Sequence, residues 1–144
     1  MKPVLIMVVS LFFVLLSGCA QQAVMPPLPE TALTTIAKDA SGQLVTLYLP
    51  AQTHLLLKSD EGNIFGKRFK SQLRNSGYAL HEFEENTIAV PKSGGKPLTY
   101  VLDALTDMSH YGYYRLTLTI GDAQLSRLYD ANDVSKPNYW SYRQ

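Results

Sequence analysis

The sequence contains few of the residues from which reactive centres are built. Its 144 residues include one cysteine, which excludes an intramolecular disulfide and a metal site made of several thiolates. The three histidines, His54, His81 and His110, have no second ligand at the spacings of zinc sites, so ordinary surface or partly buried positions are expected. We therefore expect no catalytic residue, no metal and no small-molecule substrate, and a protein that is not an enzyme.

The sequence also has almost no excess of charge. It contains 13 Lys and Arg residues against 12 Asp and Glu residues, a formal net charge of +1, whereas nucleic-acid-binding domains carry a clear basic excess. One basic helix face is expected to be a solvated surface, because no exposed aromatic side chains accompany it. Its residues are Lys67, Arg68, Lys70 and Arg74. No direct contact with nucleic acid is therefore expected.

A long apolar run is present only at the start of the chain, where Val4–Leu16 follows Lys2. A helix over this run is roughly 20 Å long, which is shorter than the ~30 Å hydrocarbon core of a membrane. A basic start, a short apolar stretch and then small residues are typical of a secretory signal peptide. Residues 1–18 are therefore predicted to be a cleaved signal peptide.

The residues at the end of this segment, Leu16-Ser17-Gly18-Cys19, resemble the lipobox of bacterial lipoproteins. The resemblance implies cleavage between Gly18 and Cys19 and a covalent lipid, including palmitate, as the only group attached to the chain. Two or three acyl chains anchor stably, since each buried CH₂ contributes ~0.8 kcal/mol. Ala20 stands where retention in the inner membrane favours aspartate, so the resemblance implies the outer membrane, with the protein facing the periplasm. The alternative is an ordinary signal sequence, or a membrane helix, with an incidental Cys19.

Residues 19–30 are predicted to be a lipid-anchored, proline-rich tether. Pro26, Pro27 and Pro29 favour an extended backbone of ~3.1 Å per residue, so about ten residues reach on the order of 30 Å. We interpret the segment as a passive spacer; a proline-rich ligand for a partner is the alternative. Loss of Lys2 with the signal peptide leaves the remaining chain formally neutral.

Two segments of the remaining chain have helical patterns. Apolar residues recur at helical spacing over residues 33–47, and Pro50 marks the end of this helix. A second helix is expected to begin at a cap formed by Ser59 or Asp60. Gly77 stands where the cap at its carboxyl end belongs.

The rest of the chain is rich in strand patterns and turn residues. Strands are expected at residues 54–58, 78–84, 87–90, 98–104, 113–120 and 123–129. Gly121-Asp122 predicts a two-residue hairpin turn between the last two. Residues 31–144 are therefore predicted to form a single α+β domain in the periplasm, with two helices packed on one face of a small, mostly antiparallel sheet.

The predicted hairpin places Arg127 opposite Leu116, on an otherwise apolar face of the sheet. Arg127 is therefore a candidate structural charge. Its guanidinium is expected either to stack on an aromatic ring or to pair with a buried carboxylate such as Asp103. The alternative is a bulge that turns the side chain out to water.

Aromatic residues are concentrated near the end of the sequence. Seven of the 13 that follow the signal peptide lie between Tyr111 and Tyr142. Tyr139, Trp140 and Tyr142 belong to a segment for which the sequence indicates no strand partner. Because tyrosine and tryptophan are favoured in sheets and at protein interfaces, this segment is expected either to fold back over the sheet or to dock on another protein. The three residues are a candidate partner interface.

Several short stretches distributed over the domain form a recognisable pattern. They are Phe65-Gly66, Gly77-Tyr78-Ala79-Leu80, Tyr114-Arg115-Leu116-Thr117-Leu118, Arg127-Leu128-Tyr129 and Tyr139-Trp140-Ser141-Tyr142-Arg143. This pattern resembles the TrbH family of conjugal-transfer lipoproteins and contains no catalytic signature. The resemblance implies a scaffolding component of a mating-pair-formation, or type IV secretion, apparatus that contacts ring or channel proteins. The alternative is an envelope lipoprotein that regulates a cell-wall or outer-membrane assembly enzyme.

Overall fold

The computed structural model describes residues 27–58, 62–83, 94–105 and 112–144. The signal peptide, Cys19 and most of the tether lie outside the described residues, as do the expected strand at 87–90 and His110. The elements in chain order are α2 (Glu30–Leu47), the short 3₁₀ helix η2 (Pro50–Gln52), β1 (His54–Lys58), α3 (Ile64–Asn75), β2 (Ala79–Phe83), β3 (Lys96–Leu105), β4 (Tyr113–Ile120), β5 (Ala123–Asp130) and β6 (Ser141–Arg143).

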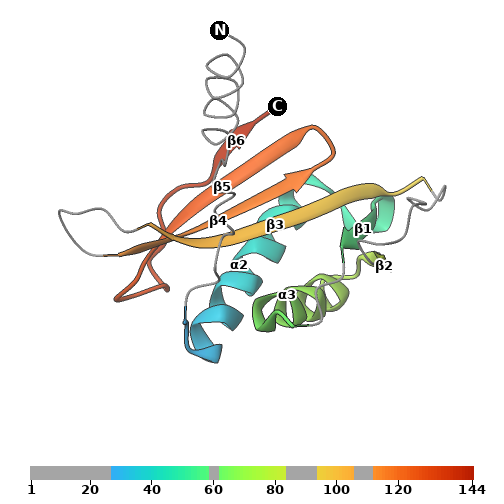
Figure 1. Ribbon diagram of the computed structural model, residues 1–144. Coiled ribbons are helices and arrows are strands. Elements are labelled where there is room, and N and C mark those ends of the chain that lie inside the picture. The colour runs from blue at the N-terminus through green and yellow to red at the C-terminus, as the bar shows by residue number, and fades with distance from the viewer. Residues whose placement is uncertain (1–26, 59–61, 84–93, 106–111) are drawn as a thin grey trace, which may run out of the picture.

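The six strands form one sheet in the order β2-β1-β3-β4-β5-β6, and both helices cover the same face (Figure 1). Three of the five neighbouring pairs are antiparallel, while β1 runs parallel to both of its neighbours. Helix α3 lies between β1 and β2 in the chain and provides the long crossover connection that parallel neighbours need. The predicted α+β class, with two helices on one face of a mostly antiparallel sheet, is confirmed.

The β4–β5 hairpin has the predicted register. Ile120 lies opposite Ala123 and Leu116 lies opposite Arg127, with no interruption along the two strands. The turn is possible because Gly121 adopts φ 58°, a left-handed conformation that most side chains disfavour. The two turn residues set the register of the hairpin, and the register determines which side chains of β4 and β5 face the helices.

Helix α2 buries one stripe of its surface against the sheet and α3, which confirms the helical spacing. The buried residues are Leu33, Ile36, Ala37, Ala40, Ser41 and Leu44. Ser41 is the polar member, and its hydroxyl lies 2.7 Å from the Ser76 hydroxyl beyond the end of α3. A buried hydroxyl is tolerated when it is hydrogen-bonded, so this contact fixes the two helices to each other.

Helix α3 begins later than predicted. Its cap is Asn63, whose side-chain oxygen accepts a hydrogen bond from the Gly66 N–H at 3.1 Å; Ser59 and Asp60, the predicted caps, lie outside the described residues. Asparagine caps helices as well as serine or aspartate does, so the helix begins at Asn63 and the predicted caps are wrong. At the other end, Gly77 has φ 90° and follows the helix as predicted.

The core contains a close approach between α3 and β3. The Phe65 and Phe69 rings meet the Tyr100 ring edge-on, with centroids 5.3 and 5.8 Å away. A Cβ atom on Gly66 would lie 2.1 Å from the Tyr100 hydroxyl oxygen. Only glycine therefore fits at this position without displacement of the aromatic group.

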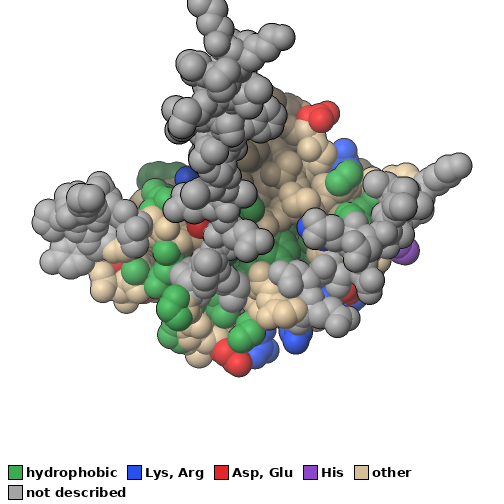
Figure 2. Space-filling model, in the orientation of Figure 1, with side chains coloured by type: hydrophobic (Ala, Val, Ile, Leu, Met, Phe, Trp, Pro, Cys, Tyr) green, Lys and Arg blue, Asp and Glu red, His purple; other side chains and the backbone are tan. Residues whose placement is uncertain are grey.

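The outer surface is mixed in character. On the face shown in Figure 2, acidic and basic side chains alternate with uncharged surface, and no broad patch of one sign is visible. Within the described ranges, no helix combines the length and the apolar character needed to span a membrane.

Candidate functional site

Arg127 points to the helix-covered face of β5, where it meets α2. Its Nη1 donates to both carboxylate oxygens of Asp39, at 2.8 and 2.9 Å. The arginine side chain is only 17% exposed and that of the aspartate 28%. Two partly buried opposite charges in this geometry form a strong, directional contact between strand and helix.

The same guanidinium also holds the segment that leads to β6. Its Nε donates to the carbonyl of Asn138 at 2.5 Å, and its carbon lies 5.3 Å from the centre of the Trp140 ring. The cation is therefore stacked on an aromatic face while it is hydrogen-bonded at both ends. Arg127 thus connects three parts of the chain: α2, β5 and residues 138–140.

Two expectations about Arg127 are corrected by this arrangement. Its carboxylate partner is Asp39, because Asp103, the predicted partner, lies on the opposite face of the sheet. There Asp103 accepts hydrogen bonds from Arg115, at 3.1 Å from Nε and 2.6 Å from Nη2. The bulge is also excluded, since the ladder from β4 to β5 continues through Arg127.

Tyr129 completes the cluster at Asp39. Its side chain is fully buried, and its hydroxyl donates to Asp39 Oδ2 at 2.7 Å. Burial raises the pKa of Tyr129 far above its ordinary value, and the hydrogen bond to the nearby Asp39 carboxylate raises it further. The phenol therefore stays protonated and acts as a permanent donor. We call Asp39, Arg127, Tyr129 and Trp140 the Asp39 cluster.

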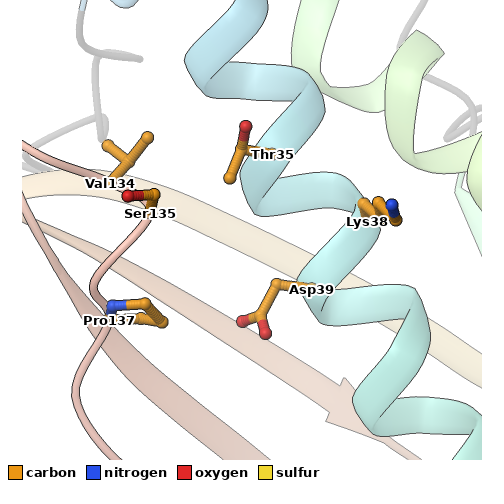
Figure 3. A pocket seen from close by; sticks show the side chains of 6 residues that line it. All are labelled: Thr35, Lys38, Asp39, Val134, Ser135 and Pro137. Carbon is orange, nitrogen blue, oxygen red and sulfur yellow. The ribbon is translucent and has the colours of Figure 1, made fainter.

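A groove of about 320 Å³ opens beside this cluster, between α2 and the segment between β5 and β6 (Figure 3). It is lined by Thr35, Lys38, Asp39, Val134, Ser135 and Pro137. In Figure 3 the Asp39 carboxylate points toward the strands, whereas Lys38 lies on the other side of the helix. Both Asp39 oxygens accept hydrogen bonds within the protein, from Arg127 and from Tyr129.

The three candidate interface residues occupy different environments. The segment has a strand partner after all, because Ser141–Arg143 form β6 against β5, with Tyr142 opposite Leu125. Trp140 packs against the core, and its indole N–H is buried without a hydrogen-bond partner among the described residues. Tyr139 is 98% exposed and Tyr142 is 49% exposed. The accessible aromatic surface is therefore Tyr139, followed by the outer part of Tyr142.

Tyr142 also borders the carboxyl end of α2. Burial and the adjacent Tyr142 hydroxyl raise the pKa of Tyr48, and the Lys96 ammonium lies 5.8 Å from the centre of the Tyr48 ring. The Tyr78 hydroxyl donates to the Tyr48 carbonyl at 2.6 Å, and burial raises the pKa of Tyr78 to about 12. With their pKa values raised, Tyr48 and Tyr78 remain neutral in the physiological range and serve as packing and hydrogen-bonding groups.

The basic face of α3 is partly neutralised by carboxylates from α2 and β2. Lys70 lies 2.7 Å from a Glu82 carboxylate oxygen, and Arg74 pairs with the other oxygen. These hydrogen bonds, first that from Lys70, lower the pKa of Glu82. Arg68 pairs with Glu30 at the start of α2.

The histidines do not combine with other ligands in the part of the chain that the structure describes. His54 and His81 lie on neighbouring strands, with ring centroids 6.5 Å apart and the rings edge to face. No group of three or more His, Cys, Asp or Glu residues in the described ranges is arranged to hold a metal ion. Gly18 and Cys19, the predicted cleavage and lipidation site, lie outside those ranges.

Comparison of the sequence with known protein families gives a match. A family model described as "Conjugal transfer protein TrbH" matches residues 17–143, almost the whole chain. No curated protein and no solved structure matches. The matched range contains the Asp39 cluster, the groove, β6 and Cys19.

Proposed function

The chain belongs to the TrbH family of conjugal transfer proteins, and from this membership we propose that it is an outer-membrane lipoprotein that scaffolds the conjugative type IV secretion, or mating-pair-formation, apparatus. The family match over residues 17–143 is the observation that carries the proposal. Membership itself implies a part in conjugal transfer; the anchor, the location and the scaffolding role are the proposed additions.

The proposed anchor is a lipid on Cys19, at the end of Leu16-Ser17-Gly18-Cys19. Several acyl chains hold a protein on a membrane far more firmly than one chain does. An anchored domain has a high effective concentration toward other components of the same envelope, so weak contacts become lasting ones. In this role the lipid is the only group that the protein carries.

We propose that the domain acts by binding and not by catalysis. The partly buried Asp39 carboxylate is bound within the protein, since Arg127 donates to both of its oxygens and Tyr129 donates to Oδ2. Catalytic carboxylates, by contrast, need an unpaired lone pair directed at a reacting atom. The arrangement suits a rigid support for the segment that follows.

That segment presents the proposed contact with ring or channel proteins. Arg127 fixes the carbonyl of Asn138, and Trp140 packs inward against the core. Tyr139, between them, is left almost fully exposed. An exposed aromatic side chain on a fixed backbone has little conformational entropy to lose on binding, and such residues dominate interface energies.

The test of the contact is Tyr139→Ala, with Tyr113→Ala, at another exposed tyrosine at the start of β4, as the control. We expect Tyr139→Ala to reduce the frequency of DNA transfer between donor and recipient cells by about tenfold or more, and to reduce co-purification with secretion proteins. The melting temperature should not change, because Tyr139 is 98% exposed. Normal transfer with Tyr139→Ala, or an equal loss with Tyr113→Ala, would refute this contact.

The anchor is tested separately with Cys19→Ser. We expect loss of labelling by radioactive palmitate and loss of the protein from the outer-membrane fraction, with the domain still folded. Retention of the label in this variant would show that Cys19 is not the lipidation site.

A further inference from the structure

The sheet ends on one side at β6, a strand of three residues with no further neighbour in the described part of the chain. All three of its residues are exposed. Backbone N–H and C=O groups of successive strand residues point alternately to the two sides. A strand paired only with β5 therefore directs the polar groups of at least one residue outward, where another strand can bind them.

This edge has few of the features that keep strands apart. Natural edge strands are protected by proline, by bulges or by projecting charges. β6 contains no proline, its register with β5 is continuous, and its one charge, on Arg143, is hydrogen-bonded to the Gln124 side chain at 2.9 Å. The edge is therefore open to pairing.

We propose that β6 pairs with β6 of a second copy of this chain, antiparallel about a two-fold axis through Tyr142. In this register Tyr142 lies opposite its own counterpart, and Ser141 lies opposite Arg143 of the other copy. Aromatic pairs directly opposite each other stabilise antiparallel strands, whereas like charges opposite each other destabilise them. Pairing with a second β6 therefore places the two aromatic side chains opposite each other and keeps the two Arg143 charges apart. The two six-stranded sheets then form one continuous sheet.

The alternative geometries for two copies are less favourable. A parallel, in-register pair places Arg143 beside its counterpart and brings two like charges together. It also lacks the two-fold symmetry that closes a dimer and stops further addition. The antiparallel register about Tyr142 therefore defines a dimer and not a fibre.

The contact is small, and this determines where it forms. Three residues on each side bury much less than the roughly 800 Å² per partner of a standard interface, so dimers are weak in dilute solution. Confinement to a membrane raises the effective concentration and shifts the equilibrium toward pairs. This strengthening, but not the pairing itself, rests on the proposed lipid anchor.

The first test uses Tyr142→Cys in the full chain, in membranes oxidised with copper phenanthroline. Directly opposite side chains have Cβ atoms about 4.5–5.5 Å apart, within reach of a disulfide after a small adjustment. We expect a disulfide-linked homodimer. The parent chain and Ser71→Cys, on the exposed outer face of α3, should give none. A disulfide-linked dimer of the parent chain would require a free Cys19 thiol, since this is the only cysteine. That result would contradict the proposed lipid anchor and would leave the pairing of β6 unaffected.

The second test reads the register. Ser141→Cys and Arg143→Cys, on two differently tagged copies in one membrane, should cross-link to each other about fivefold more than either does to itself, because diagonal neighbours are about 7–8 Å apart. Equal or stronger self-linking of the single variants would overturn the antiparallel register. Cross-linking of Tyr142→Cys to a different protein, without a homodimer, would overturn self-pairing and indicate a strand from another partner.

Discussion

The β4–β5 hairpin carries two arginine–aspartate pairs, one on each face of the sheet. On the helix-covered face, Arg127 binds Asp39, 88 positions away in sequence. On the open face, Arg115 binds Asp103, which lies directly opposite it in the neighbouring strand. The first arginine side chain is 17% exposed and the second 44%. Both are arginine–carboxylate pairs, but the first connects a strand to a helix and the second connects two neighbouring strands.

The open-face pair joins two strands that the backbone ladder already joins. Asp103 and Arg115 belong to β3 and β4, which are paired over eight positions. The Asp39–Arg127 pair joins a helix to a strand, and the same arginine fixes Asn138 and stacks on Trp140. The structural contribution of an ion pair therefore depends on its burial and on whether other contacts already connect its elements.

The sharpest test of this difference is Asp39→Ala. Removal of the carboxylate leaves the partly buried Arg127 without its counter-charge and the buried Tyr129 hydroxyl without its acceptor. Such losses are worth about 3 kcal/mol, which we expect in the free energy of unfolding measured with urea. Lys38→Ala, at the adjacent exposed position, is the control and should change stability by less than about 0.5 kcal/mol. A loss below about 1 kcal/mol for Asp39→Ala would mean that the two faces do not differ.

A second test examines the packing of the helix-covered face. Gly66→Ala places a methyl group against the Tyr100 hydroxyl, and overpacking of this kind costs about 2 kcal/mol. Adding Tyr100→Phe removes the closest atom, so the double variant should recover at least half of the lost stability in the same urea experiment. Equal destabilisation of the single and double variants would show that the close approach is not the cause.

The sequence predicted those parts of the fold that short-range patterns determine. The register of β4 and β5 follows from a two-residue turn, and the α2 stripe follows from helical spacing. Strand β6 was missed because three residues are too short to show alternation. The parallel pairing of β1 and β2 was not predicted, although the expected order of strand, helix and strand over residues 54–84 is typical of parallel neighbours.

The candidate site was predictable only in part. The hairpin register indicated an inward Arg127, but its partner lies on a helix whose rotation relative to β5 is not determined by local sequence. Asp39 stands beside the buried stripe, between Ile36 and Ala40. An acidic residue at the edge of an apolar stripe was the available signal, and it identifies a side of the helix without identifying the strand that faces it.

A smaller effect is expected at Glu82, where an ion pair joins α3 to the edge strand β2. Lys70 and Arg74 hold the pKa of Glu82 below its ordinary value of 4.5. Because the folded-state pKa is the lower one, the stabilisation is present above the unfolded-state pKa and is lost as the pH falls through the folded-state value. Glu82→Gln should therefore be less stable than the parent by about 1 kcal/mol at pH 7.

The pH profile is the control for this variant. Measured by urea unfolding from pH 7 downward, the difference between Glu82→Gln and the parent should shrink below about pH 4.5, as the carboxylate becomes protonated. A constant difference over this range would assign the effect to packing and not to charge.

The smallest effect is expected from Arg115→Ala on the open face. The Arg115 side chain is 44% exposed, so its removal opens Asp103, which is 19% exposed in the pair, to water that replaces the lost contact. Exposed pairs contribute about 0.2–1 kcal/mol, and salt screens them. We expect a loss of about 0.5 kcal/mol in urea unfolding that decreases further in 1 M NaCl, whereas the loss in Asp39→Ala persists. If Arg115→Ala were as damaging as Asp39→Ala, the backbone ladder would not be what holds β3 to β4, and the distinction between the two faces would fail.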